Sequence, residues 1–229
     1  MNKNYVSYLF SILFILSFLE SFTQEFNYQK DFETILSRTN DSNDSLFHLE
    51  LKQRFNRNDT TLSDFEILAL LINFTQNEFY QPYEILNNES KIENLVSEGE
   101  YDTAIRLCDS LLIKHPYNQA ILFEKALSHF AINQTDSSEF YRYKFNRILD
   151  AMAYSGKGTS TEDAIFSLGS MDSHSYIIRR LSQEIRQVGA GQDQHGNMID
   201  IIETFKDGEG TRLMHFQIQH AVNRLLKSD

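Results

Sequence analysis

Several kinds of residue are scarce in this chain, and each scarcity excludes a class of protein. The 229 residues include one cysteine, Cys108, so no disulfide can form within the chain. Lysine and arginine number 21 against 32 aspartates and glutamates, which leaves a net charge of -11. This balance argues against nucleic acid or an anionic membrane surface as a partner, because both bind basic patches.

The common catalytic motifs are also missing. The sequence has no Gly-x-Ser-x-Gly elbow for an acyl-transfer serine and no His-Glu-x-x-His pair for zinc. The segment Gly156-Lys157-Gly158-Thr159 differs from a phosphate-binding loop, because it lacks the first glycine and has Gly158 where Ser or Thr should follow the lysine. We therefore predict no cofactor and favour a protein that is not an enzyme.

The first residues have the pattern of an export signal. Lys3 precedes an apolar run from Tyr5 to Leu19, and small residues lie before Gln24. The run is shorter than the roughly 20 residues that a membrane-spanning helix needs. We predict a signal peptide over residues 1–23, so that the mature chain is periplasmic or secreted and keeps no stable membrane anchor.

Between residues 27 and 150, apolar residues recur every three or four positions, which predicts amphipathic helices. Ser63 and Glu66 have the spacing of a capping box, and the polar stretch 39–45 is the best candidate for an exposed loop. The predicted helices span 27–37, 46–56, 63–77, 87–97, 102–115, 118–132 and 137–150.

The stretch from Glu98 to Asn118 resembles the second half of a tetratricopeptide (TPR) repeat. Ala104, Cys108 and Pro116 occupy the small, apolar and proline positions of that pattern, after a Gly99-Glu100-Tyr101-Asp102 turn. Residues 118–132 resemble the first helix of a following repeat. The resemblance implies antiparallel helical hairpins over residues 87–154, with residues 24–86 as N-terminal capping helices.

The composition changes near the Gly-containing segment 155–160, where we expect a small C-terminal α+β part, residues 155–229. Met198–Phe205 and Thr211–Ile218 flank a Gly-containing turn and predict a β-hairpin. The other elements expected here are a strand at 165–169, a helix from Tyr176 to Val188, a Gly-rich loop from Val188 to Asn197, and a last helix at 220–227. The predicted fold is therefore mainly α, followed by this small α+β part.

A second resemblance covers more of the chain. It rests on the segments Asp59-Thr60-Thr61-Leu62, Phe79-Tyr80-Gln81-Pro82-Tyr83, Ser155-Gly156-Lys157-Gly158, Met198-Ile199-Asp200 and His215-Phe216-Gln217-Ile218. Together with the TPR-like segment, these are similar to a domain-of-unknown-function family of exported bacterial proteins. The resemblance implies a fold and a compartment but no activity.

The TPR-like hairpins also suggest a binding surface. In such stacks the first helix of each hairpin lines the concave face, which here offers Phe123, Leu127 and Phe130. These residues form either a peptide-binding stripe or the core beneath the next helix. The sequence thus favours a protein-interaction or scaffold module whose partner is another envelope protein or a peptide.

The alternative is an envelope hydrolase or a metal-dependent enzyme that uses residues near the C-terminus. Asp193 and His195 lie in the predicted Gly-rich loop, while Asp200 and His215 lie in the predicted hairpin. A site shared by these four side chains is geometrically possible. The other interpretation is that they are solvated loop residues and a strand histidine.

Overall fold

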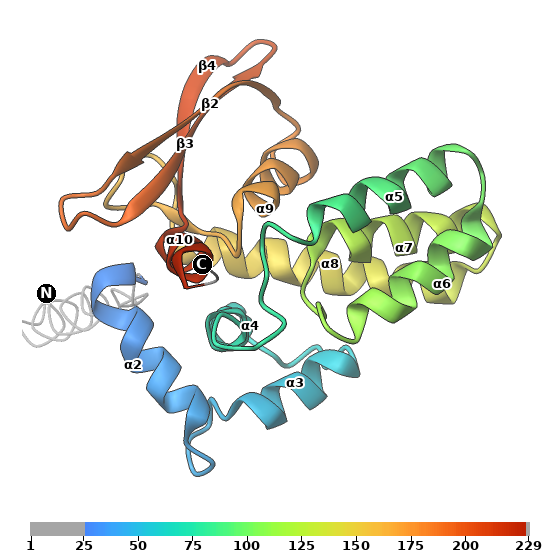
Figure 1. Cartoon of the computed structure of the whole chain (residues 1–229), viewed down its shortest axis with the longest axis horizontal. Helices are drawn as coiled ribbons and strands as arrows, with labels where there is room; N and C mark the ends of the chain where they lie inside the picture. Colours follow the sequence, from blue (N-terminus) through green and yellow to red (C-terminus); the bar gives the residue numbers. More distant parts are fainter. Residues whose placement is uncertain (1–25, 228–229) are drawn as a thin grey trace, which may run out of the picture.

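The computed structural model describes residues 26–227. Its first two helices lie along one side of the molecule and pack against the third, which packs against α8 (Thr135–Ser155) (Figure 1). The first three helices are α2 (Tyr28–Asn40), α3 (His48–Asn56) and α4 (Asp64–Phe74). The predicted capping box is confirmed, because Ser63 and Glu66 each bond the other's backbone N–H at the start of α4. Every residue from Ile67 to Ile72 is buried, so α4 is covered on all sides.

The next four helices pack each against its successor: α5 (Leu86–Ser97), α6 (Tyr101–Leu112), α7 (Gln119–Ala131) and α8 (Thr135–Ser155). The turn between α5 and α6 needs a glycine, since Gly99 has a φ of 80°. Ala104 and Cys108 are fully buried on α6. Burial raises the pKa of the Cys108 thiol to about 12, as is usual for a structural cysteine.

A four-stranded sheet follows, in the spatial order β1-β4-β3-β2. Strand β1 pairs in parallel with β4, whereas β3 pairs antiparallel with both β4 and β2. The predicted β-hairpin is confirmed as β3 and β4. The elements of this part are β1 (Ile165–Phe166), α9 (Ser170–Ser175), the π-helical turn η1 (Tyr176–Arg180), β2 (Glu184–Gln192), β3 (Met198–Lys206), β4 (Gly210–Gln217) and α10 (Gln219–Leu226).

Two predictions for this region are wrong. The predicted helix Tyr176–Val188 ends after η1. The first half of the predicted loop Val188–Asn197 belongs to strand β2, and only the half from Asp193 is a turn. Strand β2 lies at the edge of the sheet with most of its side chains exposed on both faces, so its sequence lacks the apolar alternation of a half-buried strand. At position 191 the Ile201 side chain occupies the space that a Cβ atom would need, which explains why a glycine lies within this strand.

The hydrophobic core has two parts. The larger part joins α2, α3 and α4 to α8 and the sheet, and the smaller one lies among α5, α6 and α7. The N-terminal helices, expected to cap the hairpin stack, meet that stack mainly where α4 packs against α8, and Phe32 of α2 also contacts Phe166 of the sheet. The division at residues 24–86, 87–154 and 155–229 stays a prediction.

The predicted signal peptide, residues 1–23, lies outside the described residues. Within residues 26–227, no helix is both long and apolar enough to span a bilayer.

Candidate functional site

The three residues of the predicted binding stripe lie together in a groove between α7 and α8. Phe123, Leu127 and Phe130 follow one another on one face of α7, four and three residues apart, and line a cavity of about 570 Å³. Helix α8 forms the opposite wall with residues that include Arg142 and Phe145. We call this cavity the α7–α8 groove; its volume lies in the range of small-ligand and peptide pockets.

The groove is open to solvent beside Leu127 and Phe130. Phe123 is half-buried and packs edge-on against Phe145, with 5.4 Å between ring centroids. Leu127 is 40% exposed and Phe130 is 67% exposed. Phe123 is partly a core residue, which was one interpretation of this stripe. Leu127 and Phe130 are not covered by other parts of the fold, which fits the other interpretation, a binding surface.

Two arginines border the groove in different states. The Arg179 guanidinium lies 3.3 Å from the centroid of the Phe123 ring and 3.3 Å from a carboxylate oxygen of Glu124. Burial raises the pKa of Glu124 and lowers that of Arg179, while their mutual attraction opposes both shifts. Arg142 is well exposed and forms a 3.7 Å surface ion pair with Glu139, which also lines the groove. Of the two arginines, Arg142 is therefore the more accessible to a ligand.

Neither arginine was predicted from the sequence as part of a binding site. Arg142 had a usable signal, because Ser138, Arg142 and Phe145 recur at helical spacing and so share one face of α8. Arg179 had none, since it reaches the groove from η1, beyond the predicted boundary at residue 155.

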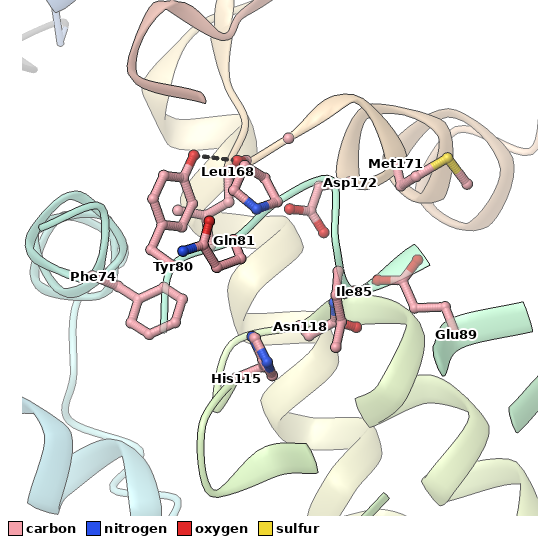
Figure 2. Close-up of a pocket in the computed structure, with 12 residues that line it drawn as sticks. Phe74, Tyr80, Gln81, Ile85, Glu89, His115, Asn118, Leu168, Met171 and Asp172 are labelled. Atoms are coloured by element: carbon pink, nitrogen blue, oxygen red, sulfur yellow. Dashed lines mark hydrogen bonds between the residues drawn. The ribbon is translucent and has the colours of Figure 1, made fainter. Parts of the chain in front are cut away.

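A second, smaller cavity lies where the chain between α4 and α5 crosses the start of α9 (Figure 2). The Tyr80 hydroxyl donates a 2.5 Å hydrogen bond to the Leu168 carbonyl, shown as a dashed line. Pro82 packs against Gly169 so closely that a Cβ atom there would lie 3.1 Å from the Pro82 Cβ. The cavity holds about 40 Å³, which is room for a water molecule or two.

This small cleft contains two carboxyl groups from different elements, Glu89 of α5 and Asp172 of α9. Burial raises the pKa of both, and the charge of Glu89 raises that of Asp172 further. Each carboxyl already has a protein donor: Asn118 Nδ2 lies 2.5 Å from Glu89, and the Gln119 backbone N–H bonds Asp172. With these bonds made and little free volume, the pair fastens α5, α7 and α9 together.

The four C-terminal Asp and His residues do not form one site. Asp193 accepts hydrogen bonds within its own turn, from the backbone N–H groups of His195 and Asn197 at 2.8 Å. Asp200 pairs with Phe216 across the β3–β4 ladder, whereas His215 pairs with Ile201, so their side chains point to opposite faces of the sheet. Within the part of the chain that the structure describes, no three His, Cys, Asp or Glu residues are placed to hold a metal ion.

Comparison with known proteins gives one relationship. Residues 33–227 match the model of a protein family described as a domain of unknown function (DUF4919). No curated protein and no solved structure gives a significant match to the chain.

Proposed function

We propose that this protein is a non-enzymatic interaction module. The chain belongs to the DUF4919 family, whose function is unknown, so the proposal rests on the surface of the protein itself. In this proposal the α7–α8 groove binds a segment of another protein. The observation that carries it is the exposure of Leu127 and Phe130 inside a concave, largely apolar cavity. Apolar side chains that line an open concavity mark binding sites more often than scattered surface residues do.

The chemistry of the groove specifies the ligand. Phe123, Leu127 and Phe130 favour a bulky apolar side chain, which would be largely desolvated on entering the cavity. Arg142 at the rim favours a carboxylate close to that side chain, and it stands out in a chain with a net charge of -11. We therefore infer a peptide segment in which a Leu, Ile or Phe lies next to Asp or Glu.

Two finer points belong to the same proposal. We infer that α5 to α8 are TPR-like hairpins, which is supported by the left-handed Gly99 turn and by the buried Ala104 and Cys108. We also infer export, which is supported by the apolar run from Tyr5 to Leu19 alone. N-terminal sequencing of the protein from its native host would show a start near Gln24; retention of residue 1 would contradict export by signal cleavage.

The binding proposal can be tested by selecting peptides from a random display library on the full chain. Enriched peptides should combine an apolar residue with a neighbouring carboxylate. Binding should weaken about thirty-fold in Phe130→Ala, the effect of removing one aromatic anchor worth about 2 kcal/mol. Arg142→Gln should weaken the binding of acidic peptides. It should leave unchanged the binding of analogues in which Asn or Gln replaces the acidic residue.

The matched control is Ile113→Ala. Ile113 is 79% exposed and apolar like Phe130, but it lies at the end of α6, outside the α7–α8 groove. Both substitutions affect exposed side chains and should change the free energy of unfolding by less than about 1 kcal/mol. If no peptide is enriched, or if peptides bind Phe130→Ala as tightly as Ile113→Ala, the groove is not a peptide-binding site.

A further inference from the structure

Strand β2 is an open edge of the sheet. It lies outermost in the order β1-β4-β3-β2 and pairs only with β3. Of its nine residues, only Ile185 and Gly191 are partly covered. Within residues 26–227, no backbone hydrogen bond joins β2 to anything other than β3. Its outward N–H and C=O groups therefore form a row that another extended strand could pair with.

The usual protections against edge pairing are confined to one end of β2. A β-bulge lies between Ile185 and Gln187, and the charged residues Glu184 and Arg186 are at the same end. From Gln187 to Gln192 the strand has no charge, no proline and no bulge. An unprotected edge of this length is a site for strand addition.

The side chains of β2 indicate which strand fits. Its first half is bulky and its second half, Gly189-Ala190-Gly191, is small. A complementary strand must therefore be small where β2 is bulky, and bulky where β2 is small. Strand β2 itself meets this requirement when it runs in the opposite direction.

We propose that two copies of this chain pair antiparallel through β2, about a two-fold axis near Gly189, to form one continuous sheet. In this register Val188 faces Ala190 of the second copy and Gln187 faces its Gly191, so each bulky residue meets a small one. Arg186 faces Gln192, and no like charges lie opposite each other. The charges of Glu184 and Arg186 cancel within each strand. The paired strands are therefore neutral, although each whole chain has a net charge of -11.

A cysteine cross-linking experiment on the full chain tests this arrangement. In Val188→Cys the new thiols lie diagonally across the axis, at roughly the 7–8 Å expected for such neighbours, and a short bismaleimide should link them. The native Cys108 is buried and should not react. Leu213→Cys is the matched control, because Leu213 is 52% exposed against 50% for Val188 but lies on β4.

Across the proposed dimer, two copies of residue 213 would be about 24 Å apart, five strand spacings, beyond the reach of the reagent. Cross-linked dimer should therefore form in Val188→Cys and be several-fold less abundant in Leu213→Cys. Equal yields in the two variants would overturn the proposal.

Sedimentation gives an independent readout. The paired surface is small, so we expect a dissociation constant in the micromolar range. Gly189→Lys places two lysines opposite each other at the axis and should give a monomer, whereas Leu213→Lys should still dimerise. Gly189 has no positive φ, and a Cβ there meets only the Ile201 carbonyl, 3.6 Å away, so the variant should fold. A wild-type monomer up to millimolar concentration, or a dimer that survives Gly189→Lys, would refute pairing through β2.

Discussion

The burial of His220 makes the fold sensitive to acid. Its imidazole is stacked 4.6 Å from the Phe166 ring and lies close to Phe32 and Tyr80. Its Nε2 lies 2.8 Å from the Ser167 carbonyl, which can only accept, so Nε2 carries the proton of the neutral ring. Burial lowers the pKa of His220 to about 3.

The direction of the effect follows from the two pKa values. In the unfolded chain the pKa is about 6.5, so between pH 6.5 and pH 3 the unfolded state binds a proton that the folded state does not. The free energy of unfolding therefore falls by about 1.4 kcal/mol for each pH unit in this window. Between pH 7.5 and pH 4.5 this one group should account for a loss of about 2 to 3 kcal/mol.

Urea unfolding of the wild type and of His220→Gln at these two pH values would measure this loss. The glutamine keeps a donor for the Ser167 carbonyl but has no proton to gain. Both proteins share every other titrating group, so the wild type should lose about 2 to 3 kcal/mol more than the variant on acidification. An equal loss in both, within about 0.5 kcal/mol, would refute the reasoning.

Two further predictions concern close contacts with backbone carbonyl oxygens. Tyr80→Phe removes the only hydroxyl donor to the Leu168 carbonyl that the structure describes, and should lower the free energy of unfolding by about 1 to 3 kcal/mol in urea titrations; an unchanged midpoint would contradict it. Gly156→Ala places a methyl group 2.8 Å from two backbone carbonyl oxygens that cannot swing away, so it should lower the melting temperature by several degrees. Gly189→Ala is the control, since it meets only ordinary contacts, and an equal fall in both variants would argue against the clash.

The helices were predictable because apolar residues recur along them at helical spacing. The predicted spans at 27–37, 46–56 and 63–77 lie within a few residues of α2, α3 and α4, and the β3–β4 hairpin follows its turn signal. Strand β2 was not predictable, because an edge strand exposed on both faces has no apolar alternation. The hydrogen-bonded pairing of β2 with β3 stabilises the strand, although its two glycines locally favour a loop.

Only the α7 side of the groove could be predicted from the sequence. Phe123, Leu127 and Phe130 belong to one helix, so their common face follows from spacing alone. The choice between core and surface depends on how closely α8 covers α7, which is a matter of helix packing that one sequence does not encode locally. Arg179 and the pairing of Glu89 with Asp172 depend on contacts between segments more than fifty residues apart.

The long helix α8 serves both the groove and the main core. Its first turns carry Ser138 and Arg142 into the groove, and its last turns carry Ala151 and Met152 into the large core. The 21 residues form a rod about 31 Å long, in which each residue turns the face by about 100°. One residue inserted between Asn146 and Ala151 would therefore rotate the groove wall a quarter turn away from α7, although it alters neither surface. Relatives that share the groove should therefore keep the number of residues between the groove-lining and core-facing parts of α8, or change it by whole pairs of helical turns. The lengths of their loops can vary freely.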